Sequence, residues 1–115
     1  MSDENTPLRR LIIRRNADSD IDRIMEYLSD NFSVAKAVQF QSAVVNAMDY
    51  LLTMPYIGPL KEVQNPSLQD MRKFIIPDFR QYLIFYLTPE GTIEIVRVLH
   101  SSQDTDAILE AEILE

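Results

Sequence analysis

The stretch FRQYLIFYLTPEGTIEIVRVLHSSQD, residues 79–104, decides the fold of this 115-residue chain. Its runs 79–87 and 92–100 are rich in Tyr, Phe, Ile and Val, which half-buried strands favour. A Pro-Glu-Gly turn separates the two runs, and a connection this short makes neighbouring strands antiparallel. Residues 71–76, which a Pro-Asp turn joins to the first run, predict a third strand. We therefore expect a three-stranded antiparallel meander.

Two helices are predicted upstream of the meander. Residues 18–30 carry apolar residues at three- to four-residue spacing, and Ser19 with Asp22 fits a capping box. Residues 33–53 form a longer apolar pattern with Ser33 as its N-cap, and the proline that follows Met54 ends it. Few residues join the two helices, so we expect an antiparallel hairpin. The apolar face of the longer helix is predicted to include Val34, Ala37, Val38, Phe40, Val44, Val45, Ala47, Met48, Leu51 and Leu52.

The remaining segments complete an α+β fold. Residues 8–15 (LRRLIIRR) predict an N-terminal strand, and residues 55–69, with three prolines and a glycine, predict a surface loop. Residues 104–115 predict a short C-terminal helix that begins at a capping box of Ser101 and Asp104. Its apolar side is predicted to hold Ala107, Ile108, Ala111 and Leu114.

These elements predict a single domain over residues 8–115, preceded by a disordered segment at residues 1–7. The element order is strand, helix, helix, three strands, helix. We expect the helices to cover one face of an antiparallel sheet of about four strands.

Charge and composition restrict the classes of function. The formal net charge is −7, and residues 101–115 carry five acids and no base. Such a balance argues against strong nonspecific binding of RNA or DNA but leaves room for a local basic patch. No cysteine and one histidine exclude a disulfide, a cysteine zinc site and a multi-histidine metal site, and no cofactor is predicted.

The location of the protein is predicted from what its sequence lacks. No apolar run approaches the roughly 18–20 residues that span a bilayer. The N-terminus MSDENTPLRR has acids where a signal peptide needs basic residues. We therefore expect a soluble cytoplasmic protein. The sequence also lacks the common catalytic motifs, which argues against a small-molecule enzyme.

Arg80 and the tyrosines of the meander are candidate site residues with two interpretations each. Placed on the second meander strand, Arg80 would share a face with Tyr82, Ile84 and Tyr86. It is either a solvated strand charge or a contact for phosphate or carboxylate. Tyr82 and Tyr86 are either core aromatics with a bonded hydroxyl or neighbours of that contact.

Arg97 and His100 are the candidates on the last strand. Regular alternation would place Arg97 beside Ile95 and Leu99, on an apolar face where a charge needs a partner. It is either ion-paired to an acid from a helix or a site residue that faces the target. His100 is either hydrogen-bonded structurally or a general acid/base.

Three stretches together resemble one family over about residues 11–109. They are NADSDIDRIMEYLSDNFSVAKAVQF (16–40), Met54-Pro55 followed by Gly58, and FRQYLIFY with IEIVRVLH and an aspartate four residues on. The chain thereby resembles the RelE/ParE toxin superfamily of bacterial plasmid-stabilisation proteins, and its strand sequences are closer to the ParE branch.

The resemblance implies a toxin whose partner is an antitoxin encoded nearby, with which it would form a hetero-oligomer. ParE-like members bind DNA gyrase, whereas RelE-like members cleave ribosome-bound mRNA with basic residues and a tyrosine. Gln103 stands where many members have an arginine, which weakens the ribonuclease interpretation. We therefore expect gyrase inhibition by binding; the alternatives are RelE-type endoribonuclease activity and a non-toxic binding relative.

The two activities have different candidate residues, of which the resemblance itself supports His100. Catalytic candidates, if the chain is an enzyme, are Arg80, Tyr86 and His100. Candidates for target binding are Arg72, Lys73, Arg80, Arg97 and His100, whose four cations would converge in a basic patch in the ribonuclease alternative. No residue is assigned to a metal.

Overall fold

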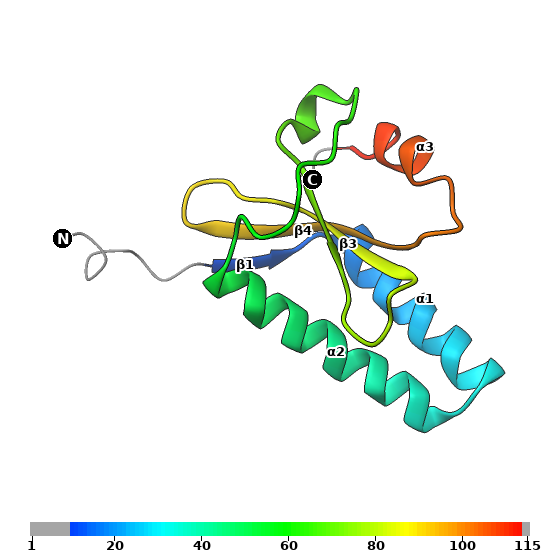
Figure 1. Cartoon of the computed structure of the whole chain (residues 1–115). Helices are drawn as coiled ribbons and strands as arrows, with labels where there is room; N and C mark the ends of the chain where they lie inside the picture. The colour runs from blue at the N-terminus through cyan, green and yellow to red at the C-terminus, as the bar shows by residue number, and fades with distance from the viewer. Residues whose placement is uncertain (1–9, 114–115) are drawn as a thin grey trace.

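The computed structural model describes residues 10–113, so the segment predicted to be disordered at residues 1–7 lies outside the described residues. The fold class is confirmed: an N-terminal strand, a helical hairpin, a three-stranded meander and a short C-terminal helix (Figure 1). The elements are β1 (Arg10–Ile13), α1 (Arg15–Asn31), α2 (Val34–Thr53), the 3-10 turn η2 (Pro66–Leu68), β2 (Arg72–Ile75), β3 (Tyr82–Leu87), β4 (Thr92–His100) and α3 (Thr105–Glu110).

The four strands form one sheet in the order β1-β4-β3-β2. The predicted antiparallel meander of β2, β3 and β4 is confirmed, and β4 has the predicted bounds. The sheet is not wholly antiparallel, because β1 pairs with β4 in parallel, from Arg10 opposite Thr92 to Ile13 opposite Ile95. Two helices and two strands separate β1 from β4 in the chain, so no short turn imposes an antiparallel pairing.

A β-bulge interrupts β4 where its pairing with β3 shifts register. Ile95 and Val98, three residues apart, both join the core beneath the helical hairpin, whereas Val96 and Leu99 join the core on the opposite face. The predicted placement of Arg97 beside Ile95 and Leu99 on one face is therefore wrong. An extra residue in one strand breaks the two-residue alternation on which that prediction rested.

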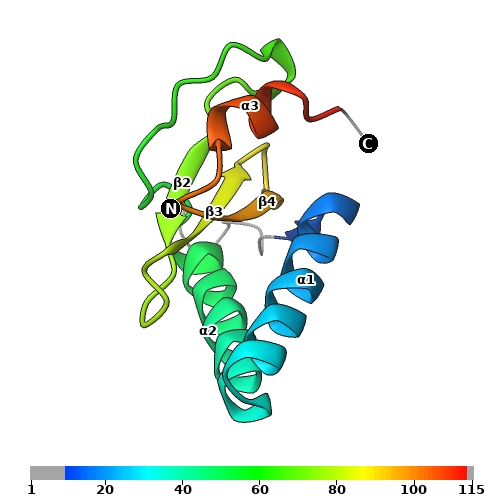
Figure 2. The same ribbon diagram turned by 90° about the vertical axis from the view of Figure 1, so that its right-hand side faces the viewer.

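The helical hairpin packs against one face of the sheet (Figure 2). Ser33 caps α2 as predicted, since its side chain accepts a hydrogen bond from the Lys36 amide at 3.0 Å. The predicted capping box of α1 is wrong, because this helix already begins at Arg15, and its N-cap residue makes no side-chain capping bond. The strand runs directly into the helix and leaves Ser19 and Asp22 inside it.

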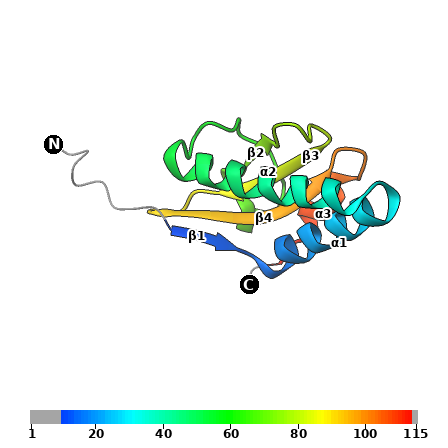
Figure 3. The same ribbon diagram turned by 90° about the horizontal axis from the view of Figure 1, so that it is seen from below.

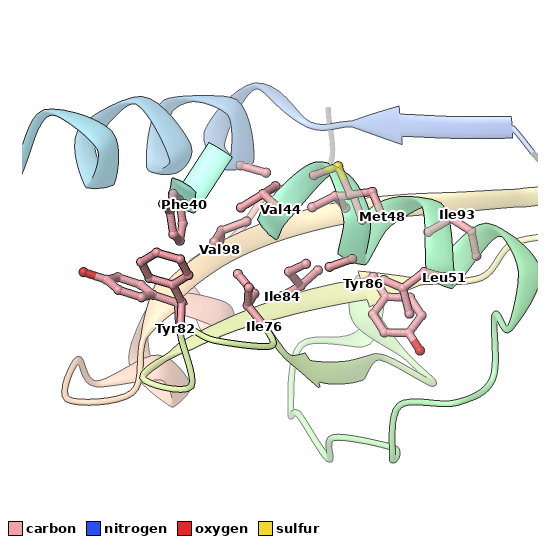
Figure 4. Close-up of a cluster of buried hydrophobic side chains, with 14 of the residues drawn as sticks. Phe40, Val44, Met48, Leu51, Ile76, Tyr82, Ile84, Tyr86, Ile93 and Val98 are labelled. Atoms are coloured by element: carbon pink, nitrogen blue, oxygen red, sulfur yellow. The ribbon is translucent and has the colours of Figure 1, made fainter. Parts of the chain in front are cut away.

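The first core lies between α2 and the sheet (Figure 4). Phe40 packs edge-on against Phe79 and Tyr82, with ring centroids 5.3 and 5.2 Å apart. The buried residues of α2 are Ala37, Phe40, Val44, Ala47, Met48 and Leu51. The predicted apolar face was too wide: the valines Val34, Val38 and Val45 are exposed.

A second core covers the opposite face of the sheet. The prediction that all helices cover one face is therefore wrong, because α3 lies on the face opposite to the helical hairpin (Figure 2). Here α3 and the loop after α2 pack on residues such as Phe85 and Val96. Asp104, not Ser101, caps α3 by accepting from the Ala107 amide. Of the predicted apolar side of α3, Ile108 packs against this core, Ala107 and Ala111 are exposed, and Leu114 lies outside the described residues; the buried residue of α3 is Leu109.

Candidate functional site

A cleft of about 430 Å³ lies where the end of β4, α1 and the turn before α3 meet. Aromatic and charged side chains both contribute to its walls. They are Asp20, Arg23, Ile24, Tyr27, Tyr82, Val98, His100, Ser102 and Gln103. A neighbouring depression shares Tyr27, Tyr82 and His100 with this cleft and adds Lys36 and Phe32.

His100 is fixed in the cleft by the turn that follows it. The amide of Ser102 donates to Nδ1 at 3.0 Å, and the Ser102 hydroxyl lies 2.7 Å from the same atom. Because Nδ1 accepts, the neutral ring carries its proton on Nε2. The His100 amide donates to the side chain of Gln103 at 2.8 Å, and the ring packs edge-on against Tyr82 at 5.0 Å. Gln103 thus serves the turn that orients the histidine.

Asp20 is the buried anion at the floor of the cleft, with a side chain that is 1% exposed. It accepts from Arg97 Nε at 2.7 Å and Nη2 at 2.8 Å, and from the Val98 amide at 2.9 Å. Arg23 donates to it as well. The hydrogen bond with Asp20 raises the pKa of Arg97 above its ordinary value. Of the two interpretations offered for Arg97, the ion pair with a helical acid is the one observed.

The ion-pair network continues to the C-terminal segment through Glu112, whose side chain is 0% exposed. Glu112 lies 3.3 Å from Arg97 Nη1 and 3.8 Å from Arg14 Nη1, and Asn16 also donates to it. Arg14 in turn donates to Glu94 at 2.7 Å. Buried charges need such partners, because an unpaired ion in the interior is costly. The network ties β1, α1, β4 and the C-terminal segment together.

The other predicted cations lie elsewhere. Arg72 donates to the carbonyls of Tyr56 and Gly58 at 3.0 and 2.8 Å, so it holds the loop after α2. Lys73 is half-buried on β2. Arg80 is exposed in the turn before β3, not on the strand where we expected it. Arg72 and Arg97 bind partners in different parts of the fold, so these two arginines do not meet in the predicted patch.

Tyr86, a catalytic candidate, is fully buried in the first core (Figure 4). Its hydroxyl donates to the carbonyl of Pro55 at 2.9 Å and accepts from the amide of Gly58 at 3.0 Å. Burial raises the pKa of this tyrosine. A β-carbon at Gly58 would overlap the carbonyl oxygen of Lys73, so this position requires glycine. The motif Pro55-x-x-Gly58 is thus explained by the Tyr86 hydroxyl, which forms hydrogen bonds with the backbone at both of its ends.

Sequence reasoning missed the buried acids of the site and their partner Arg14. In the sequence, Asp20 is one of three acids near a helix start, and Glu112 belongs to an acidic tail; both look solvated. The available signal was Arg97 itself, a charge within an apolar strand, which required an acid from elsewhere. Which acid fills that role depends on the crossing of α1 over β4, which the sequence pattern does not give.

The described residues 10–113 contain no group of three or more His, Cys, Asp or Glu residues able to hold a metal ion. They contain no helix of the length and apolarity that a membrane span requires.

The fold and the ion-pair network define a small α+β protein of a known architecture. The solved structure "Chromosomal ParDE TA system from P. aeruginosa" superposes on it with a TM-score of 0.66, covering 81% of this chain and 96% of that one at 17% identity. At that identity the match establishes the fold.

The family follows from the sequence comparisons. The model of the family "ParE toxin of type II toxin-antitoxin system, parDE" matches residues 11–105, and the chain therefore belongs to this family. Toxin ParE1 of Mycobacterium tuberculosis is similar to it, 28% identical over 98 residues, in strains CDC 1551 / Oshkosh and ATCC 25618 / H37Rv. That match covers 84% of this chain and 94% of the relative. The resemblance to the ParE branch of the RelE/ParE superfamily is confirmed.

Proposed function

We propose that this chain inhibits DNA gyrase by binding it in the cytoplasm, and that an antitoxin encoded beside it masks this activity. Membership of the ParE toxin family supports the toxin role. A relative of the same fold is described as a ParDE system, which supports an antitoxin as the partner. The gyrase target is the specific part of the proposal.

The internal partners of the candidate catalytic groups support inhibition by binding rather than RNA cleavage. Cleavage of a phosphodiester needs cations free to meet the phosphate and an acid/base group beside it. Arg97 is held by Asp20 and Glu112, and Tyr86 is buried with both hydrogen-bonding roles of its hydroxyl filled. A binding inhibitor needs no such groups.

One observation favours the ribonuclease alternative. The cleft brings His100 and Arg23 to the same walls, and the Arg23 side chain is 63% exposed, so a phosphate in the cleft would meet a cation and a titratable ring. This pairing was not expected from the sequence. It makes His100→Ala and Arg23→Ala the variants that separate the two activities.

Two assays on the purified chain distinguish the targets. We expect inhibition of gyrase supercoiling with no translation-dependent mRNA cleavage. His100→Ala should leave supercoiling inhibition within about twofold of wild type, whereas Arg80→Ala should weaken it if the exposed Arg80 contacts the target. Cleavage that disappears in His100→Ala or Arg23→Ala, while supercoiling is untouched, would reverse the assignment.

Toxicity and the antitoxin are tested by regulated expression in a bacterial host. We expect growth arrest that co-expression of the neighbouring reading frame relieves. Normal growth at confirmed expression of folded protein would instead identify a non-toxic binding relative.

A further inference from the structure

The loop after α2 is apolar where a surface loop is usually polar. Residues 50–60 (YLLTMPYIGPL), from the last turn of α2 into this loop, include no charged residue, although 25% of the chain is charged. Four large apolar side chains of the loop are exposed: Met54 (46%), Tyr56 (59%), Ile57 (43%) and Leu60 (60%). We call these four residues the loop patch. Single exposed apolar residues are ordinary, but a group of them on one surface marks a place that another molecule covers.

The loop patch lies along the edge of the sheet that β2 forms. Leu60 is paired with Arg72 at the start of β2, and the Arg72 guanidinium lies over the Tyr56 ring, 5.2 Å from its centre. Met54 and Ile57 belong to one turn, in which the Ile57 amide donates to the Met54 carbonyl at 3.1 Å. Because β1 forms the opposite edge of the sheet, the patch is on the side of the molecule away from β1 (Figure 3).

The backbone of this loop is fixed by hydrogen bonds to the sheet. Arg72 and the Tyr86 hydroxyl hold residues 55–58 through the contacts described above. Beyond them, the Lys73 amide donates to the Pro59 carbonyl at 3.1 Å. The loop therefore presents its apolar side chains in a fixed arrangement before a partner binds. Binding to such a preorganised surface loses little conformational entropy, which favours affinity.

The composition of the loop patch is typical of the centre of a protein–protein interface. Such centres are depleted of charged residues and enriched in Tyr, Met and Arg. Here Met54 and Tyr56 belong to the patch, and Arg72 supplies a positive charge beside it. Nucleic acid fits this surface poorly, because phosphate binding needs several cations that make contact together. The charge of Arg72 favours a protein partner with a carboxylate beside an apolar pocket.

Two other occupants fit the loop patch less well. In a symmetric contact between two copies the patch would meet itself, so that Arg72 of one copy would approach Arg72 of the other, and like charges there are unfavourable. A flexible antitoxin segment gains affinity by wrapping a long surface, whereas the patch spans only residues 54–60 of one fixed loop. A small, preformed surface suits a folded partner that docks with little rearrangement.

We propose that the loop patch is the surface by which this chain binds its target enzyme. The patch enters an apolar pocket of that enzyme, and Arg72 lies beside a carboxylate at the rim of the pocket. This inference rests on the proposed function, which identifies the target as DNA gyrase. Tyr56 is the expected anchor, because tyrosine is among the residue types that dominate binding energy at interfaces.

Truncation of the loop patch tests this inference in the gyrase supercoiling assay. We expect the double variant Tyr56→Ala, Leu60→Ala to raise the concentration for half-maximal inhibition about tenfold or more. The double variant Val34→Ala, Val45→Ala is the matched control, because these valines of α2 are 68% and 51% exposed and lie outside the loop. The control should stay within about twofold of wild type. Circular dichroism of each variant verifies the fold, and substitutions of exposed side chains usually change stability little.

Opposite charges at one position test the chemistry of the partner. Leu60→Glu and Leu60→Lys remove the same exposed side chain and add charges of opposite sign. A pocket with a carboxylate at its rim should reject the glutamate more strongly, so the half-inhibitory concentration of Leu60→Glu should exceed that of Leu60→Lys by about fivefold or more. The reverse order would overturn the acidic rim. This pair also carries the test of the patch if the double alanine variant fails to fold.

The outcomes separate this inference from the proposed function. Folded patch variants that inhibit gyrase as strongly as the wild type would overturn the patch assignment and leave gyrase inhibition standing. A wild-type chain that does not inhibit gyrase would overturn both. Patch variants that still inhibit gyrase but no longer bind the product of the neighbouring reading frame would show that the antitoxin occupies the patch. Dimers of the chain alone that Leu60→Glu dissociates in sedimentation velocity would show that a second copy occupies it, and either result refutes the assignment.

Discussion

Replacing Asp20 with alanine tests the ion-pair network at its centre. The change removes the partner of Arg97 and leaves the Val98 amide without an acceptor. Removing one member of a buried ion pair costs about 3–5 kcal/mol. The Arg97 side chain remains 15% exposed and keeps Glu112, which places the expected loss at the lower end, about 3 kcal/mol.

The free energy of unfolding is measured by urea titration followed by circular dichroism. A domain of this size has a stability of roughly 5–15 kcal/mol, so the expected loss is a large fraction of it. Asp20→Asn, which can still accept from the Val98 amide, should lose about half as much. Asp22→Asn is the matched control, because Asp22 lies in the same helix but is exposed, and it should change stability by less than about 0.5 kcal/mol.

A double-mutant cycle with Arg97→Ala isolates the pair itself. In the Asp20→Ala background, Arg97→Ala should cost less than it does in the wild type, by more than about 1 kcal/mol, because its partner is already absent. Equal losses for Asp20→Ala and Asp22→Asn, or purely additive effects in the cycle, would refute a stabilising role for the network.

Three further predictions concern the loop after α2. Tyr86→Phe should lower stability by about 1–2 kcal/mol. Because burial raises the Tyr86 pKa, the wild type should lose stability as the pH rises through and above about 10, and the variant should lose less. Unfolding curves at alkaline pH measure this difference. Gly58→Ala should cost about 2–3 kcal/mol, because the added carbon would overlap the Lys73 carbonyl oxygen and would lie 2.8 Å from the Tyr86 hydroxyl. Gly91→Ala, which meets no atom within 4 Å, should cost about 1 kcal/mol from its positive φ; similar melting temperatures would contradict this. Lys61→Ala should change stability by less than about 0.5 kcal/mol, because its ion pair is solvent-exposed, and a larger loss in urea titration would exclude this.

The strands and the longer helix were predictable because local patterns determine them. Ser33 caps α2 as its side chain and position require, and the β-branched run 92–100 forms one continuous strand. The bulge at Val96 was not predictable, because its alternative, a regular strand, has the same residue pattern. Its effect is to place Ile95 on the face opposite to Leu99, so that Arg97 does not share a face with both, and Arg97 pairs with Asp20.

The acids of the C-terminal segment show where sequence reasoning about charge fails. The five acids of residues 101–115 suggested a surface that repels phosphate. In the described part of that segment, each acid has a partner within the chain: Asp104 caps α3, Asp106 pairs with Lys61, Glu110 accepts from the Gln64 amide, and Glu112 pairs with Arg97. Of these four acids only Glu112 is buried, against Arg97 and Arg14, whereas Asp104, Asp106 and Glu110 remain exposed, so the net charge is misleading chiefly for Glu112.

The choice between a gyrase inhibitor and a ribonuclease therefore does not rest on the total of −7. It rests on which cations remain available to a target. Arg97 and Arg72 are engaged by the fold, and Arg23, although exposed at the cleft, is paired with Asp20. Lys36, which lines the depression beside His100, and Arg80 are exposed. Phosphate binding scales with the number of cations that make contact together, so the engagement of Arg97, Arg72 and Arg23 by internal partners weakens the case for cleavage, whereas a protein target can use an exposed cation such as Arg80 singly.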